Sequence, residues 1–198
     1  MITSDKSNGY ETIAEQFIRA RNTRIGPATV SEWSRSLKPN ATILELGCGH
    51  GVISQTLVDR GFDLYAIDAS PKLIHAFREH FPLIPTECAA VEESNFFNRA
   101  FDAILAWGLI FLMPPESQKL LIVKSANALA PGGQLLFTAP QRAIEWKDSL
   151  TNLQSISLGA ETYEKLLNTN GFTVIGGDKD EGDNFYYIAQ KPFTSVKG

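Results

Sequence analysis

The chain has 198 residues, of which 43% are hydrophobic and 20% charged, as in an ordinary globular domain and unlike a disordered chain, a collagen or a coiled coil. Its 18 lysines and arginines against 22 aspartates and glutamates give a formal net charge of −4, which argues against a surface that grips nucleic-acid phosphates. The two cysteines, Cys48 and Cys88, form no CxxC pair, so neither a disulfide scaffold nor a zinc cluster is indicated.

The hydropathy of the chain indicates no membrane partner. The longest apolar stretch, residues 103–115, is too short and too interrupted to cross a bilayer. The sequence shows no basic region followed by an apolar core at its start, as a secretory signal would. We therefore expect a cytoplasmic protein.

Two helices are predicted before residue 40. Apolar side chains recur at helical spacing in the first of them: Tyr10, Ile13, Ala14, Phe17 and Ile18. Arg21 extends that face. It could carry its charge out to solvent from a buried stripe, or pair with an anion as part of a lid. The second helix is expected at about residues 27–37, with a proline near its first turn and a breaker after it.

From residue 41 the chain alternates short apolar runs with amphipathic stretches. Strands are expected at 42–46, 63–67, 84–88, 101–107 and 134–139, and helices at 52–60, 71–80 and 115–129. This alternation predicts parallel strands joined by right-handed crossovers. Residues 140–158 are expected to be irregular, followed by a helix at 160–170 that ends at Gly171. Strands at 172–176 and 185–190 then close the chain as an antiparallel hairpin.

The first of these strands runs into a loop with glycines at alternate positions, Gly47, Gly49 and Gly51. Without Cβ atoms, a ligand can lie against the backbone at the carboxyl end of the strand. The nicotinamide fingerprint GxGxxG is not satisfied, because its third position holds Val52 or Ser54. The glycines could also serve a turn without a ligand.

Asp68 ends the next predicted strand, about twenty residues after the glycines, where its carboxylate can accept both hydroxyls of an adenosine ribose. It could instead cap the helix at 71–80, although Ser70 suits that role better.

The segments ELGCGHG, AIDAS, FDAILAWG and LAPGGQLLF together resemble those of class I S-adenosylmethionine-dependent methyltransferases. The resemblance covers about residues 40–140 in motif detail and the whole chain in element order. It implies one α/β domain over residues 1–198, with a helical cap at 1–39 and a three-layer Rossmann-like core at 40–198. The implied sheet has seven mostly parallel strands in the order 3-2-1-4-5-7-6, with strand 7 antiparallel. S-adenosyl-L-methionine is the implied cofactor.

The resemblance also implies a cofactor site at the strand ends. Its positions are Glu45, Gly47, Cys48, Gly49, Gly51, Asp68, Ala69, Ser70, Ala90, Val91, Glu92, Ala106 and Trp107. Glu45 and the glycine loop would line the methionine half, and Asp68 would hold the ribose. Many relatives carry an aspartate where Ala90 stands, so either Glu92 or a backbone amide must read the adenine amino group. Arg21 is the candidate partner of the methionine carboxylate.

The acceptor is expected to be a small, partly apolar molecule. The loop after the fourth strand reads Ala106-Trp107-Gly108-Leu109, and the Asn/Asp-Pro-Pro-Tyr/Phe loop of adenine and glutamine methyltransferases is absent from it. Candidate acceptor-binding residues are Tyr10, Trp107, Phe111 and Trp146. Residues 140–158 follow the fifth strand at the ligand edge of the sheet and are expected to form part of the acceptor pocket, although they could instead be an irregular surface excursion. Trp107 could equally be a core residue.

No catalytic residue and no metal ligand is predicted. The methyl group of a sulfonium is already activated, so a base is needed only if the acceptor must lose a proton early. His75 and His80 are five residues apart, off the spacing of a helical metal site. Two other functions stay open: a non-catalytic cofactor-binding protein of the same fold, and a nicotinamide-dependent oxidoreductase, which the missing third glycine disfavours.

Overall fold

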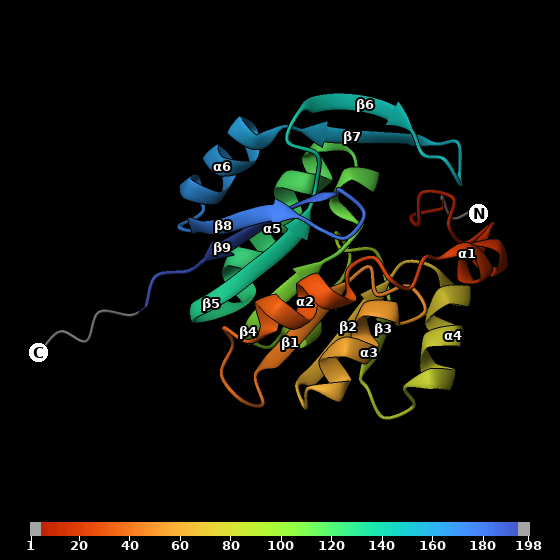
Figure 1. Ribbon diagram of the computed structural model, residues 1–198, viewed down its shortest axis with the longest axis horizontal. Helices are drawn as coiled ribbons and strands as arrows, with labels where there is room; N and C mark the ends of the chain where they lie inside the picture. Colours follow the sequence, from red (N-terminus) through yellow and green to blue (C-terminus); the bar gives the residue numbers. More distant parts are fainter. Residues whose placement is uncertain (1–4, 194–198) are drawn as a thin grey trace, which may run out of the picture.

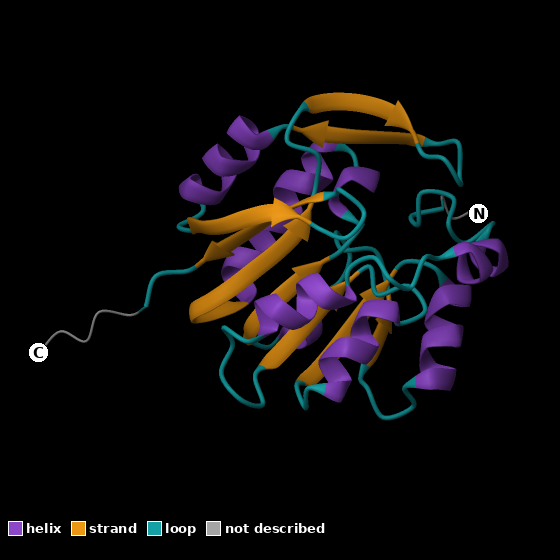
Figure 2. Cartoon of the chain, in the orientation of Figure 1, coloured by secondary structure: helices purple, strands orange, loops and turns teal. Residues whose placement is uncertain are grey.

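The computed structural model describes residues 5–193, and the ends of the predicted domain, 1–4 and 194–198, lie outside them. Its centre is a seven-stranded sheet with helices on both faces (Figures 1 and 2). The strands are β1 (Thr42–Leu46), β2 (Asp63–Asp68), β3 (Thr86–Cys88), β4 (Phe101–Ala106), β5 (Leu129–Thr138), β8 (Thr173–Lys179) and β9 (Phe185–Gln190).

The sheet order is β3-β2-β1-β4-β5-β9-β8. Strands β1 to β5 are parallel, and β9 is antiparallel to both of its neighbours. Because β8 and β9 are the sixth and seventh strands of this sheet, the predicted order 3-2-1-4-5-7-6 with an antiparallel strand 7 is confirmed.

The helices are α1 (Ala14–Ala20), α2 (Pro27–Ser34), α3 (Val52–Asp59), α4 (Pro71–His80), α5 (Pro115–Ala128) and α6 (Ala160–Thr169), with 3-10 turns η1 (Phe96–Asn98) and η2 (Ile110–Leu112). In Figure 1, α2 and α3 lie in front of the sheet and α5 lies behind it. Two predicted helices are too long at one end: α1 begins four residues after Tyr10, and α2 ends at Ser34. The residues before α1 form turns because Gly9 has a φ of +85° and Asp5 holds its amide at 3.0 Å.

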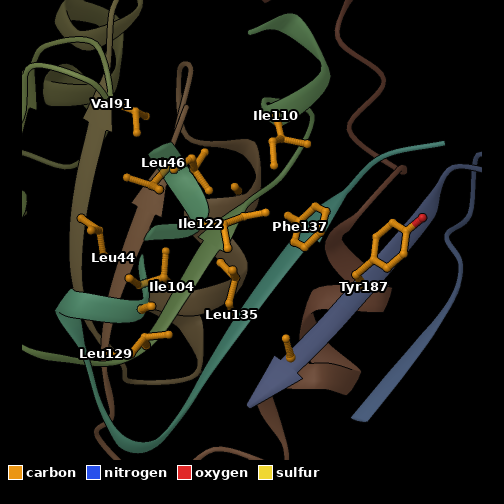
Figure 3. Packing of buried hydrophobic residues seen from close by; sticks show 14 of the residues in the cluster. Leu44, Leu46, Val91, Ile104, Ile110, Ile122, Leu129, Leu135, Phe137 and Tyr187 are labelled. Carbon is orange, nitrogen blue, oxygen red and sulfur yellow. The ribbon is translucent and has the colours of Figure 1, made fainter. Parts of the chain in front are cut away.

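The central strands are buried on both faces, as their continuous apolar runs predict. One face carries Leu44, Ile104 and Leu135, which pack with Ile122 of α5 (Figure 3). The opposite face carries side chains of the same strands that pack against α2 and α3, such as Ile43. This double core fixes the carboxyl ends of the strands, from which the loops of the site emerge.

Residues 140–158 are not irregular, so that prediction was wrong. They form a separate antiparallel hairpin of β6 (Ala143–Lys147) and β7 (Gln154–Leu158), which packs on η2. The sequence hides β7 because Ser155 and Ser157 take its buried face while Ile156 is only half-buried. Buried Gln118 of α5 holds the strand by donating a hydrogen bond to the Ile156 carbonyl at 2.9 Å.

Within residues 5–193, every helix is too short or too polar to cross a lipid bilayer.

Candidate functional site

A cavity of about 460 Å³ lies at the carboxyl ends of β1, β2, β3 and β4. That volume is within the range of about 300–1,000 Å³ common for small-molecule sites. The carboxyl edge of a parallel sheet is also where open α/β folds bind their ligands. The N-terminal segment (residues 5–21) contributes part of the wall.

Most of the predicted site residues meet in this cavity. The ones that line it are Tyr10, Arg21, Glu45, Gly47, Cys48, Gly49, Asp68, Ala69, Ala90, Val91, Glu92 and Trp107. The structure places five others outside its lining: Gly51, Ser70, Ala106, Phe111 and Trp146.

The glycine loop after β1 contains two kinds of glycine. Gly49 and Gly51 both have positive φ, +56° and +98°, where a side chain is strained. A Cβ on Gly49 would meet only Phe17, at 3.5 Å, and Gly49 faces the cavity. A Cβ on Gly51 would lie 2.3 Å from the ring of Phe81. Gly51 is therefore required by packing at the end of α4, and Gly49 leaves room beside the cavity.

Asp68 joins the glycine loop to the start of α4. One carboxylate oxygen accepts the amide of Gly49 and the other accepts the amide of Ser70, each at 2.8 Å. Burial raises the pKa of Asp68, and these amides oppose the rise. The Ser70 hydroxyl accepts the amide of Leu73 at 3.2 Å, so Ser70 is the N-cap of α4. Each carboxylate oxygen can accept two hydrogen bonds, so Asp68 can still accept hydrogen bonds from a ligand at the cavity wall.

Glu45 lies on β1 at the bottom of the cavity, with 2% of its surface exposed. Burial raises its pKa to about 8, although its carboxyl accepts a 2.5 Å hydrogen bond from Ser54. Glu45 is therefore largely protonated near pH 7, and a cation bound beside it would favour the ionised form. Burial also raises the pKa of the neighbouring Cys48 thiol, which keeps it neutral and weakly nucleophilic.

The chain after β3 forms a turn at the cavity wall, here called the 90–94 turn. The Ala90 carbonyl accepts the amides of Glu93 and Ser94, both at 3.0 Å. Among residues 5–193, no protein group accepts the amides of Val91 and Glu92. Both residues line the cavity, so these amides are available to a ligand.

Arg21 reaches the cavity wall from the end of α1. Its guanidinium donates to the carbonyls of Asn22 and Ile25, the latter at 3.1 Å. Burial lowers its pKa, while the carboxylate of Asp180 opposes that change. The structure therefore gives Arg21 carbonyl partners at the site, and its contact with a ligand carboxylate stays a prediction.

The predicted aromatic residues do not act as one group. Trp107 packs in the core on the face of the sheet covered by α2 and α3, and it also lines the cavity. Its role in binding stays a prediction. Phe111 and Trp146 pack against each other with ring centroids 5.5 Å apart. Because neither ring lines the cavity, this pair fastens the β6–β7 hairpin to η2.

Sequence reasoning missed part of the wall. Residues of the lining that were not predicted include Asp5, Lys6, Ser7, Asn8, Leu109, Leu112, Met113, Pro114 and Ser117. Residues 5–8 reach the cavity from the turns that precede α1, and no local sequence pattern predicts this contact. In residues 5–193 no group of three or more histidine, cysteine, aspartate or glutamate side chains is arranged so that it could bind a metal ion.

A family model described as "Methyltransferase domain" matches residues 43–133. The chain is 27% identical over 128 residues to a ubiquinone biosynthesis O-methyltransferase of Xanthomonas axonopodis pv. citri (strain 306), a match that covers 60% of this chain and 51% of that protein. The chain thus spans about half the length of the curated relatives it matches.

Two solved structures share nearly the whole fold. The CcbJ methyltransferase from Streptomyces caelestis superposes with a TM-score of 0.80 at 13% identity, over 96% of this chain and 100% of that one. The 1,6-didemethyltoxoflavin-N1-methyltransferase of Burkholderia thailandensis, solved with its substrate and S-adenosylhomocysteine, gives 0.73 at 14% identity, over 92% and 84%. At these identities the likeness concerns the fold.

Proposed function

We propose that this chain, whose residues 43–133 form a methyltransferase domain within a class I S-adenosylmethionine-dependent methyltransferase fold, transfers a methyl group from S-adenosyl-L-methionine to a small, partly apolar acceptor. The matched domain and the shared fold confirm the resemblance noted in the sequence. The activity, the acceptor, the single-domain organisation and the cytoplasmic location belong to the proposal.

The observation that carries the proposal is the meeting of three features at one cavity, two of the backbone and one of a side chain. The open face of Gly49, the carboxylate of Asp68 and the free amides of the 90–94 turn come from three different strand ends. Together they fit a nucleoside that carries an amino-acid tail: the carboxylate suits ribose hydroxyls, and the amides suit the acceptor nitrogens of adenine.

When bound, the cofactor supplies an activated methyl group. The residues of this chain then bind and orient the two reactants, since transfer requires the nucleophile at about 3–3.5 Å from the methyl carbon, in line with the departing sulfur. Glu45, at the bottom of the cavity, would ionise beside the positive charge of the cofactor. The N-terminal segment would exclude water from the site.

The remaining wall supports a small, partly apolar acceptor. Leu109, Leu112, Met113 and Pro114 offer it an apolar surface, and Tyr10 offers a ring with a polar tip. Among the relatives, one is named for ubiquinone biosynthesis and one for a toxoflavin precursor, both small molecules.

The test has two parts. Calorimetry with S-adenosylhomocysteine measures whether the cofactor site binds, with NAD as the control ligand. A release assay for S-adenosylhomocysteine then screens phenols, amines and thiols as acceptors. Binding together with turnover supports the proposal. Binding without turnover on any acceptor would favour the non-catalytic alternative, and binding of NAD alone would favour the oxidoreductase.

A further inference from the structure

Lys124 projects from α5 toward the 90–94 turn. Its ammonium donates hydrogen bonds to the carbonyls of Val91, at 2.5 Å, of Glu92, at 3.3 Å, and of Ser94. An ammonium has three hydrogens, so all of its donors are used. It also lies 4.7 Å from the centre of the Phe96 ring, which adds a cation–π contact.

Lys124 does not line the cavity, although the turn that it holds does. Val91 and Glu92 line the cavity, whereas Lys124 lines a separate shallow hollow together with Ser94 and Phe96. In helix-like backbone the N–H groups point opposite to the C=O groups. Carbonyls that point at Lys124 therefore leave the amides of Val91 and Glu92 directed away from it, in the part of the turn that lines the cavity.

The backbone just after this turn is strained. Phe96, Phe97 and Asn98 have φ values of +49°, +54° and +52°, a left-handed conformation that L-residues rarely adopt in succession. Such a segment persists only where its surroundings hold it. Ser94 does so on one side, because its hydroxyl accepts the Phe96 amide at 2.9 Å, and Lys124 binds the Ser94 carbonyl.

We propose that Lys124 is a positioning residue for adenine recognition: it holds the carbonyls of the 90–94 turn so that the amides of Val91 and Glu92 bind the adenine edge. This deepens the proposed function and rests on it. Ala90 offers no polar side chain at this wall, and the carboxylate of Glu92 can only accept hydrogen bonds. The acceptor nitrogens of adenine therefore need the backbone amides, and the backbone needs a fixed anchor. Lys124 supplies that anchor without touching the ligand.

The test compares two ligands on three variants. Lys124→Met removes the ammonium and keeps much of the stem, and Lys124→Arg keeps the charge. Lys119→Met is the matched control, because Lys119 is a partly exposed lysine on the same helix that forms an ion pair with Glu116. Calorimetry measures the affinity of each for S-adenosylhomocysteine and for S-inosylhomocysteine, whose base carries a hydrogen on N1. Circular dichroism checks that each variant is folded.

Lys124→Met should bind S-adenosylhomocysteine about tenfold more weakly, the loss expected from one or two misplaced hydrogen bonds, and should discriminate less between the two bases. Lys124→Arg should recover part of the discrimination, and Lys119→Met should match the wild type. An unchanged ratio of the two affinities in folded Lys124→Met, whether both ligands weaken equally or neither does, would overturn the inference. Failure of the wild type to bind S-adenosylhomocysteine would instead overturn the proposed function.

Discussion

The hydroxyl of Tyr10 donates a hydrogen bond to a carboxylate oxygen of Asp148 at 3.2 Å, although the two residues are 138 positions apart. The other oxygen of Asp148 accepts the amides of Leu150 and Thr151, at 2.9 and 2.8 Å. One carboxylate therefore shapes the turn of the β6–β7 hairpin and also holds the N-terminal segment, which lies beside that turn in Figure 1. The same segment is also held to the start of α4, where Glu11 accepts a hydrogen bond from the hydroxyl of Ser70 at 2.5 Å.

Removing the Tyr10 hydroxyl should loosen the contact between the N-terminal segment and the β6–β7 hairpin without unfolding the protein. Tyr10→Phe keeps the edge-on contact with Phe17, whose ring centroid lies 5.0 Å away, and loses the bond to Asp148. The cost should be about 1 kcal/mol, or about a fivefold rise in local opening. Hydrogen exchange should therefore accelerate both in residues 10–20 and in the hairpin turn. Tyr65→Phe, a hydroxyl deletion far from the hairpin, is the control, and unaltered exchange at both places in Tyr10→Phe would refute the link.

Ligand binding should order the N-terminal segment further. Arg21 lies at the cavity wall near the end of that segment, and a charge-assisted contact with the ligand carboxylate would add to its carbonyl contacts. Adding S-adenosylhomocysteine should slow exchange across residues 10–21, and Arg21→Ala should weaken both the binding and this protection. If a folded Arg21→Ala binds S-adenosylhomocysteine with wild-type affinity, Arg21 does not contact the ligand and serves only to bind the carbonyls of Asn22 and Ile25.

Substitutions at Gly49 and at Gly51 should have different effects. Gly49→Val meets left-handed strain of about 1–2 kcal/mol but open space, so we expect a folded protein that has lost S-adenosylhomocysteine binding. Gly51→Ala adds a collision with Phe81 to similar strain, so we expect a further loss of about 1–3 kcal/mol in the free energy of unfolding. Urea denaturation and calorimetry on both variants separate the two effects. Normal ligand binding by Gly49→Val would show that the glycine loop is only a turn, with no part in binding the ligand.

Much of this arrangement is local and could be predicted. The buried runs around Leu44 and Ile104, the glycine loop and the strand-end position of Asp68 all follow from spacing along the chain. The β6–β7 hairpin could not be predicted, because Ser155 occupies its buried face. Lys124 gave no signal either, since a lysine on an amphipathic helix is normally solvated and its carbonyl partners lie about thirty residues earlier in the sequence.

Glu45 should make the stability of the protein depend on pH. Its pKa is raised from 4.5 to about 8 in the folded state, so between these values the native protein binds the proton more strongly than the unfolded chain does. The contribution of Glu45 to the free energy of unfolding therefore falls as the pH rises from 4.5 to about 8, by up to about 1.4 kcal/mol per pH unit.

Glu45→Gln removes this titration while leaving a side chain that can accept the Ser54 hydroxyl. The free energy of unfolding of Glu45→Gln, relative to that of the wild type, should therefore increase between pH 5 and pH 8. Urea denaturation at both pH values measures this difference. A constant difference between the two proteins across this range would show that Glu45 is ionised in the folded protein.

The most direct measurement of the central claim is the calorimetric affinity of Asp68→Ala for S-adenosylhomocysteine. Losing a charged hydrogen-bond partner of the ribose should cost about 1.5–3 kcal/mol, or about one to two decades of affinity. Asp68→Asn, which can still accept one backbone amide, serves as the second variant in case the alanine variant is unstable. Asp63→Ala, at the exposed start of β2, is the control and should bind like the wild type. We expect both Asp68 variants to fold and to bind S-adenosylhomocysteine much more weakly, and wild-type affinity in either one would contradict a cofactor site at this cavity.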